Sequence, residues 1–269
     1  MELLVEHDTT YTYATPLRYS VQYLRLRPNQ SSLQSVWQWS VAGPEAMTQF
    51  RDGFGNDVDV LAVTRSHHTY TLAVRGRVRT TDGGGIVPTD GETLPPAVFL
   101  RPTALTSINA DIAEFAQAAT KRAKGLAAVE RLVESVGAKV EYRHGATTSQ
   151  TTAPEVLSLG AGVCQDFSHL LIACCRSLRI PARYVSGYYW ADAAGAEYEA
   201  NHAWVEAHVG DQGWMAFDTT NQKRVDDAYV RLAAGLDYLD AAPVRGMRRG
   251  GGTESLSVRV RVAAAQSQQ

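Results

Sequence analysis

Hydrophobic and polar residues alternate along much of the first 82 residues, and turn-forming residues separate the alternating stretches. A period of two with many Thr, Tyr, Val and Trp residues is typical of β-strands that bury one face. We therefore predict an N-terminal antiparallel β domain over residues 1–85. Its predicted strands are Thr9–Tyr13, Gln22–Arg27, Trp37–Val41, Val58–Val63 and Tyr70–Arg79.

Arginines occupy alternate positions in two of these stretches, Gln22–Arg27 and Leu72–Arg79. Side chains that alternate in this way lie on one face of a sheet. We expect a solvated or ion-paired face, and a substrate-binding patch is the alternative interpretation.

The pattern changes in Gly83–Pro102, where Gly and Pro are too frequent for a regular element. We expect a linker over residues 86–105 and a second domain over residues 106–262. Within that domain, helical periodicity comes first.

Apolar residues recur every three or four positions in Asn109–Lys121 and Leu126–Val136. This spacing predicts two helices, with Gly125 and Gly137 as their stops. A capping box that begins at Thr152 predicts the start of a short third helix.

The remaining part of the domain combines one helix with strands. Apolar periodicity after Cys164 predicts the fourth helix. The predicted strands are Ala182–Trp190, Ala203–Val209, Trp214–Phe217 and Leu256–Val262. We expect a loop at Ala191–Ala196, mixed loop and helix at Asp226–Leu239, and a disordered tail over residues 263–269. Together these elements predict an α+β protein.

Composition narrows the function classes. The chain has 269 residues, of which 45% are apolar and 20% charged, and its formal net charge is −2. This balance is ordinary for a globular protein and does not indicate nucleic-acid or membrane partners. No apolar run approaches the roughly 20 residues that span a bilayer, and the N-terminus lacks the features of a secretory signal. The sequence leaves self-association into a homo-oligomer open.

The three cysteines, Cys164, Cys174 and Cys175, lie in one short stretch. An odd, clustered set of this kind is no disulfide framework, and it favours a reducing, cytoplasmic location. Cys174 and Cys175 fall among Leu and Ile residues of the predicted helix, so we interpret them as core residues.

Cys164 is the candidate nucleophile. Gly160 and Gly162 mark a turn before it, so Cys164 lies in the first turn of the predicted helix. The unpaired N–H groups and the dipole of a helix start favour an anion, and the N–H of Cys164 would face a developing oxyanion. A thiol attacks as its thiolate, which such a position stabilises. We interpret Asp166, in the same turn, as a helix cap.

An imidazole and a carboxylate follow on two predicted strands, since His202 opens one strand and Asp218 closes the next. If Val209 pairs with Gly213 across a three-residue loop, Asp218 lies opposite Trp204, and His202 is its diagonal neighbour on the same face. A His–Asp pair therefore predicts an odd-length loop or a bulge at this turn. The carboxylate would orient the imidazole, and the imidazole would hold the thiol proton.

Each of these residues alone has an ordinary structural interpretation: a buried Cys, a structural His, an Asp that caps a turn. Their joint arrangement favours a thiol site. Metal binding is the rival use of the same residue types. The sequence has seven histidines but no C-x-x-C or H-E-x-x-H spacing, so we expect no metal site.

Four segments resemble the bacterial transglutaminase-like superfamily, in the branch of transglutaminase-like cysteine peptidases. They are GAGVCQDF at Gly160–Phe167, RIPARYVSGY at Arg179–Tyr188, NHAWVEA at Asn201–Ala207 and GWMAFDTTN at Gly213–Asn221. Their order and spacing make the resemblance specific. Leu24–Pro28 and Arg51–Asn56 also resemble the N-terminal β domain of that branch, so the resemblance covers most of the chain.

The resemblance implies a papain-like core, in which a helix presents the Cys against an antiparallel sheet that carries the His and the Asp. It implies Cys164 as the nucleophile, His202 as general base and then acid, and Asp218 as the orienting carboxylate, without a metal or an organic cofactor. One departure is Leu236, where an Arg is expected. The neighbouring positions that we predict at a substrate cleft are Gly162, Gln165, Tyr188, Asn201 and Trp204.

The reaction itself stays open at this point. A thioester formed from a peptide-type amide can be hydrolysed, attacked by an amine, or formed in reverse for ligation. We predict hydrolysis or acyl transfer on a peptide or protein amide. A catalytically silent binding or scaffold module on the same fold is the alternative. The N-terminal domain could shape the cleft, mask it or mediate self-association.

Overall fold

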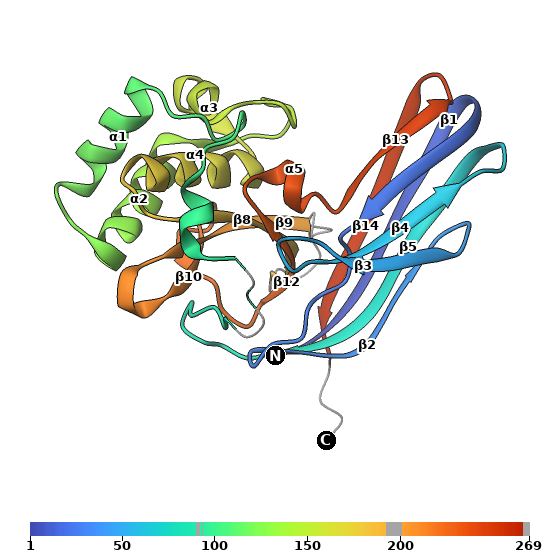
Figure 1. Ribbon diagram of the computed structural model, residues 1–269, viewed down its shortest axis with the longest axis horizontal. Helices are drawn as coiled ribbons and strands as arrows, with labels where there is room; N and C mark the ends of the chain where they lie inside the picture. Colours follow the sequence, from blue (N-terminus) through green and yellow to red (C-terminus); the bar gives the residue numbers. More distant parts are fainter. Residues whose placement is uncertain (90–91, 93, 192–200, 266–269) are drawn as a thin grey trace.

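The computed structural model describes residues 1–89, 92, 94–191 and 201–265, and its elements form two lobes (Figure 1). One lobe consists of long antiparallel strands and is called the β lobe. The other combines helices with a smaller sheet and is called the α/β lobe. This arrangement confirms the predicted α+β fold class.

The β lobe is a seven-stranded antiparallel sheet. Its strands are β1 (Glu2–Leu24), β2 (Gln34–Ala42), β3 (Met47–Arg51), β4 (Asp57–Val63), β5 (His67–Thr80), β13 (Val244–Gly250) and β14 (Glu254–Ala264). The predicted strands Thr9–Tyr13 and Gln22–Arg27 are parts of the single long strand β1. The pairing of β1 shifts between Thr12 and Leu17, so that its first part pairs with β5 and β14 and its second part with β4 and β13.

The C-terminal strands return to the β lobe. The predicted strand Leu256–Val262 is the middle of β14, which pairs with β1 and not with the sheet of the α/β lobe. Val260 and Val262 of its alternating apolar series pack against the core of the β lobe, whereas Leu256 and Val258 are exposed. β14 continues to Ala264, within the predicted tail, and residues 266–269 lie outside the described residues.

Ion pairs cover the arginine-rich face of the β lobe. Arg75 and Arg77 of β5 pair with acidic residues of β1. Arg75 pairs with Asp8 at 2.8 Å, and Arg77 pairs with Glu2. These contacts confirm the interpretation of an ion-paired face. Exposed pairs contribute only about 0–1 kcal/mol each, so backbone pairing holds this sheet together.

The α/β lobe contains all the helices that the structure describes, and none of these is long and apolar enough to cross a membrane. The helices are α1 (Ala110–Thr120), α2 (Gly125–Lys139), α3 (Ala153–Leu159), α4 (Cys164–Ser177) and α5 (Tyr238–Ala241), with the 3₁₀ turns η1 (Pro96–Leu100) and η2 (Gly210–Gln212). The strands are β6 (Glu141–Tyr142), β7 (Ala161–Gly162), β8 (Ala182–Tyr189), β9 (Asn201–His208), β10 (Trp214–Asp218), β11 (Lys223–Arg224) and β12 (Tyr229–Gly235). A five-stranded antiparallel sheet has the order β11-β10-β9-β8-β12.

Helix starts follow the capping signals of the sequence. Asn109 caps α1, since its Oδ1 accepts a hydrogen bond from the Ile112 N–H at 2.9 Å. Thr152 and Glu155 form the predicted capping box at α3. These caps satisfy N–H groups that a helix start leaves without intrahelical partners.

Three predictions in this lobe are wrong. Gly125 does not end the first helix, because α1 ends at Thr120 and Gly125 is the first residue of α2. Gly137 does not end a helix, because α2 continues to Lys139, and a Cβ at Gly137 would lie 2.7 Å from the Gln222 side chain. The segment Asp226–Leu239 contains the strand β12, which is buried on both faces and therefore lacks the alternation of apolar and polar residues that marks a half-buried strand. The predicted loop Ala191–Ala196, apart from Ala191, lies outside the described residues.

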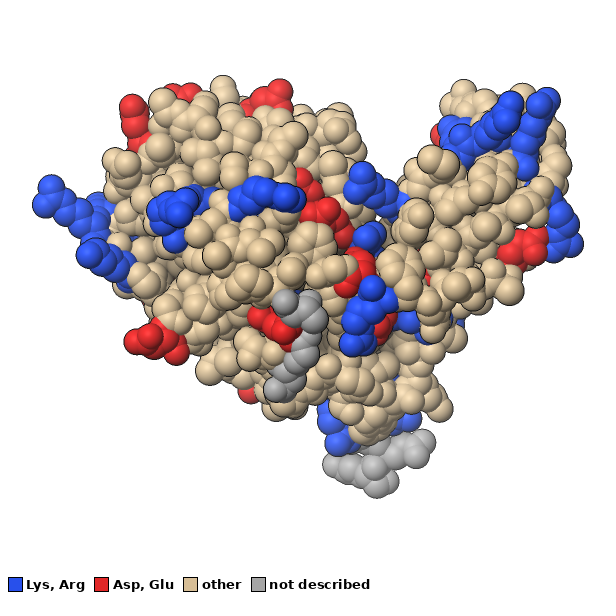
Figure 2. Space-filling view, viewed as in Figure 1, with Lys and Arg blue, Asp and Glu red and all other residues tan. Residues whose placement is uncertain are grey.

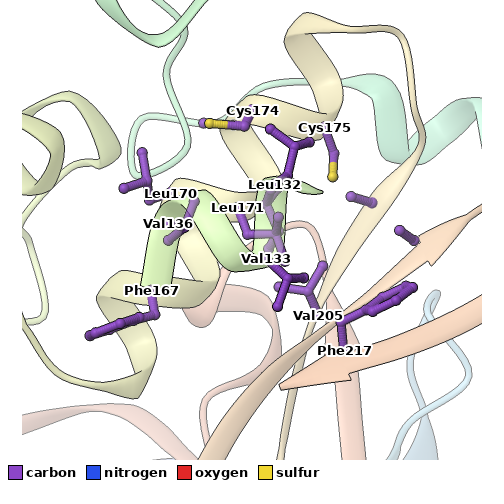
Figure 3. Packing of buried hydrophobic residues seen from close by; sticks show 14 of the residues in the cluster. Leu132, Val133, Val136, Phe167, Leu170, Leu171, Cys174, Cys175, Val205 and Phe217 are labelled. Atoms are coloured by element: carbon purple, nitrogen blue, oxygen red, sulfur yellow. The ribbon is translucent and has the colours of Figure 1, made fainter. Parts of the chain in front are cut away.

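The core of the α/β lobe forms where α4 packs against α2 and the sheet (Figure 3). Leu171 of α4 is fully buried there, and Val205 and Phe217 complete the cluster from β9 and β10. Cys174 and Cys175 are buried in the same cluster, as predicted. Because the rest of α4 is covered, the first turn of this helix is the part that can meet a substrate.

The linker packs on the α/β lobe through a buried arginine. Arg176 of α4 donates hydrogen bonds to Phe99 O at 2.9 Å and to Thr106 Oγ1 at 2.7 Å. It also donates to Leu236 O at 2.7 Å. Leu236, where an Arg is expected, is itself buried beside Phe99, and the guanidinium of Arg176 supports this region from α4.

Two side-chain amides of the β lobe complete the free edge of β12. Gln34 donates from Nε2 to Arg231 O at 2.9 Å and accepts from the Arg231 N–H at 2.8 Å. Asn56 makes the same pair of bonds with Ala234, both at 2.8 Å. These amides act in place of a further strand and satisfy backbone groups that would otherwise be buried without partners. Figure 2 shows a notch between the lobes, with acidic and basic side chains close together where they meet.

Replacement of the buried amide tests this contact. Asn56→Ala should lower the free energy of unfolding by about 1–3 kcal/mol, because the N–H and C=O of Ala234 lose their partners. The matched control is Gln38→Ala, which removes an exposed amide from β2. Urea unfolding followed by circular dichroism measures both variants. A loss below about 0.5 kcal/mol for Asn56→Ala, the range of ordinary surface substitutions, would contradict the role of this side chain.

Candidate active site

Cys164 is the first residue of α4 and is half-buried. α3 ends at Gly160 with φ 66°, a left-handed conformation that Gly adopts easily. The short strand β7 and the extended Val163 then lead into α4. Cys164 therefore stands where a helix offers unpaired N–H groups and the positive end of its dipole.

Asp166 caps this helix start, as predicted. Its Oδ2 accepts hydrogen bonds from the Val163 N–H at 2.8 Å and from Thr147 Oγ1 at 2.6 Å. The carboxylate is buried, and burial raises its pKa. A Cβ at Gly162 would lie 2.6 Å from Asp166, so Gly162 makes room for the cap and does not contact it through a side chain.

The turn between β9 and β10 has the register that a His–Asp pair requires. The Val209 N–H bonds to Gly213 O at 2.8 Å across η2, and Phe217 lies opposite Val205. The loop is three residues long, as predicted. Asp218 is consequently level with Trp204, two positions from His202 along β9. The His202 Nε2 and the Asp218 Oδ2 lie 2.7 Å apart.

Several donors surround the Asp218 carboxylate, which is fully buried. Tyr229 Oη and Asn221 Nδ2 each donate to Oδ2 at 2.6 Å, and the Asn221 N–H donates to Oδ1 at 3.1 Å. Burial raises the pKa of Asp218, but the hydrogen bond and charge of His202 outweigh it and lower this pKa below its usual value. The carboxylate is therefore ionised at neutral pH.

His202 lies between this carboxylate and the sulfur of Cys164. Burial lowers the pKa of His202, but hydrogen bonds to Asp218 and Cys164, with the charges of both groups, raise it to about 10. Because Nε2 bonds to Asp218, Nδ1 is the ring nitrogen that remains for the sulfur. The structure thus joins His202 to Asp218 by a hydrogen bond, with Cys164 close enough to His202 to affect its pKa.

Aromatic rings enclose the imidazole. The ring centroids of Tyr189, Tyr229 and Trp204 lie 5.4, 6.1 and 6.5 Å from that of His202. Lys223 Nζ lies 5.1 Å from the centroids of both tyrosine rings. These contacts limit water around the His–Asp pair and strengthen its electrostatics.

Four of the five predicted cleft residues lie beside Cys164 or His202, in the chain or in space. Gly162 and Gln165 flank Cys164, and the Gln165 amide approaches Ser149 O at 3.5 Å. Asn201 begins β9, and Trp204 is buried beside His202.

Tyr188 does not line a cleft at Cys164. It is fully buried against the β lobe, and its hydroxyl lies 2.8 Å from His7 Nδ1. Neighbouring residues of a strand point in opposite directions, and Tyr189, not Tyr188, faces His202.

Sequence reasoning missed Tyr229 and Asn221 as partners of Asp218. Asn221 follows Asp218 in a turn, and the Asp-Thr-Thr-Asn pattern suggests only a capped turn. Tyr229 lies on the unpredicted strand β12, so no signal indicated it. Within the described residues, no group of three or more His, Cys, Asp or Glu side chains is placed to hold a metal ion.

Comparison with known proteins agrees with this geometry. Residues 112–219 match the sequence model of the transglutaminase-like superfamily, and residues 3–79 match that of the bacterial transglutaminase-like N-terminal region. An uncharacterized protein of Mycobacterium leprae is 32% identical over 96% of this chain and 97% of its own length. A protein-glutamine gamma-glutamyltransferase of Pseudomonas aeruginosa is 31% identical, but over 33% of this chain and 15% of its own length.

The crystal structure of a protein named "Putative Cysteine Protease" from Cytophaga hutchinsonii has a similar fold, with a TM-score of 0.80 and 25% identity. The similarity covers 100% of this chain and 92% of that protein. Both lobes are therefore shared with it. Together with the matched sequence models, these relatives show that the chain belongs to the transglutaminase-like superfamily, with the N-terminal region of its bacterial members.

Proposed function

We propose that the protein is a thiol enzyme that acts on peptide-type amide bonds through an acyl-enzyme on Cys164. One observation carries this proposal: His202 Nε2 is hydrogen-bonded to the buried Asp218 carboxylate, and its other ring nitrogen remains for the nearby Cys164 at the start of α4. The names of two similar proteins, a gamma-glutamyltransferase and a cysteine protease, fit acyl transfer and amide hydrolysis.

The charges of the site prepare the nucleophile. With its pKa raised, His202 carries a proton at neutral pH, and an imidazolium beside a sulfur stabilises the thiolate. The ionised Asp218 holds the ring in position and stabilises its positive charge. Tyr229 and Asn221 in turn hold the carboxylate.

Acylation follows from this arrangement. The Cys164 thiolate attacks the carbonyl carbon of the amide, a C–S bond forms, and the carbonyl oxygen becomes an oxyanion. The Cys164 N–H at the start of α4 faces that oxygen and stabilises it. The His202 imidazolium gives its proton to the amide nitrogen, the C–N bond breaks, and the amine leaves.

Deacylation completes the cycle. The neutral His202 takes a proton from water or from an incoming amine, which attacks the thioester carbon. The C–S bond breaks and the thiolate returns. Water gives hydrolysis and an amine gives acyl transfer, so both reactions use the same three side chains.

Alkylation of Cys164 tests the ion pair without a known substrate. Iodoacetamide should label Cys164 and leave the buried Cys174 and Cys175 unlabelled. At pH 6 the rate should fall by at least about tenfold in His202→Ala, because the imidazolium that stabilises the thiolate is lost. The control is His68→Ala, an exposed histidine of the β lobe. Equal rates in His202→Ala and in the unaltered protein would favour the silent scaffold module instead.

Turnover separates hydrolysis from acyl transfer. We expect either cleavage of fluorescein-labelled casein or incorporation of dansylcadaverine into casein, and a loss of at least about a thousandfold in Cys164→Ala. Retained turnover in that variant would refute the assignment of the nucleophile.

The pKa of His202 gives a pH-dependent prediction. A folded pKa of about 10, against 6.5 for the ordinary group, contributes stability that is complete below pH 6.5 and lost as the pH rises through 10. Asp218→Asn should weaken this dependence, because the hydrogen bond and the charge of Asp218, which raise the pKa of His202 against burial, are then lost. Urea unfolding between pH 6 and 10 and NMR titration of the imidazole measure it. Asp211→Asn, at an exposed turn, serves as the control. A His202 that titrates near 6.5 in the unaltered protein would disprove the ion-paired arrangement.

A further inference from the structure

A cleft between the two lobes lies behind the candidate active site. It encloses about 980 Å³, open solvent included. Residues 29–34 of the β lobe form one wall, and residues 80–88 of the linker region form another. Trp204 and Tyr229 line its α/β side, whereas Cys164, His202 and Asp218 are not among its described lining residues.

Charged side chains of the α/β lobe form the polar part of this cleft. The buried Glu206 accepts hydrogen bonds from Arg183 Nε at 2.5 Å and from Arg231 Nε at 2.7 Å. Burial raises the pKa of Glu206, but the two guanidinium groups lower it to about 2. The negative charge of Glu206 thus balances one of two positive charges, those of the buried Arg183 and the half-buried Arg231.

Glu92 balances the second positive charge. Its Oε1 lies 2.6 Å from Arg183 Nη2, and its side chain is 24% exposed. Arg183 is held firmly, because its guanidinium lies 4.1 Å from the Trp214 ring centroid and bonds to Glu206 on its other side. The anchored group is therefore Arg183, and Glu92 is a solvent-accessible partner from the linker region.

We propose that this cleft is a binding site for a small carboxylate ligand, whose carboxylate takes the place of the Glu92 carboxylate on Arg183. A planar guanidinium offers paired N–H donors that match a carboxylate. The exposed Ile86 and the half-buried Val87 supply apolar surface for the body of the ligand. A free small acid and the C-terminal carboxylate of a short peptide share this chemistry.

The inner wall of the cleft includes two buried rings that support the proposed catalytic residues. Trp204 packs against His202, and Tyr229 donates to Asp218. Binding in the cleft does not require turnover, so this inference and the proposed function fail independently.

Removal of the internal carboxylate tests the site. Glu92→Gln should bind glutarate at least tenfold more tightly than the unaltered protein in isothermal calorimetry, because the competing carboxylate is gone. Glu45→Gln, which breaks an exposed ion pair with Arg65 elsewhere in the β lobe, should bind like the unaltered protein. Trialanine and trialanine amide distinguish the sources: binding of trialanine but not of its amide identifies a peptide C-terminus, and binding of glutarate alone identifies a free acid.

Two readouts place the ligand on Arg183. Saturating glutarate should shift the indole N–H resonance of Trp214 in the NMR spectrum of Glu92→Gln, and Arg183→Gln added to that variant should abolish binding. The NMR readout needs no substitution at the buried arginine. Glutarate that binds Glu92→Gln no more tightly than the unaltered protein, or that leaves the Trp214 resonance unshifted, would overturn the proposal.

Discussion

The register of β9 against β10 is the constraint on which the candidate site depends. A slip by one residue would turn Asp218 to the face that Phe217 occupies, inside the helix-covered core. The three-residue turn fixes the register. Its first residue, Gly210, and the residue that follows it, Gly213, have φ angles of 67° and 72°. Residues other than Gly would be strained at such positive φ angles. The hydrogen bond between the buried Asp218 carboxylate and the His202 imidazole follows from that geometry.

The β lobe takes part in this geometry through β12. This strand carries Tyr229, which holds Asp218, and its outer edge bonds to the amides of Gln34 and Asn56. The position of the carboxylate is therefore connected to the other lobe by one strand. The β lobe of this protein is accordingly part of the support of the candidate site as well as a neighbour of it.

The sequence predicts the centre of the site better than its surroundings. Cys164 is recognisable from a local turn and helix pattern, and His202 and Asp218 from strand parity across one short hairpin. Tyr229 and the amide of Asn56 act over larger separations: Asn56 lies 178 positions from Ala234. A buried amide that completes a strand edge looks in sequence like any turn residue. Tyr188 is a residue that the sequence wrongly assigned to the cleft. It lies in one of the segments that resemble the family, but its ring packs against the β lobe.

The pairing of β1 with β13 and β14 has a consequence for biosynthesis. Strands from the beginning and the end of the chain share one sheet, so the sheet cannot be complete until the last strands have left the ribosome. β1 can pair early with β4 and β5, but its other edge stays open until the last strands are translated. Open strand edges are prone to aggregation. A nascent chain that pauses before residue 244 would expose this edge and depend on chaperones to protect it.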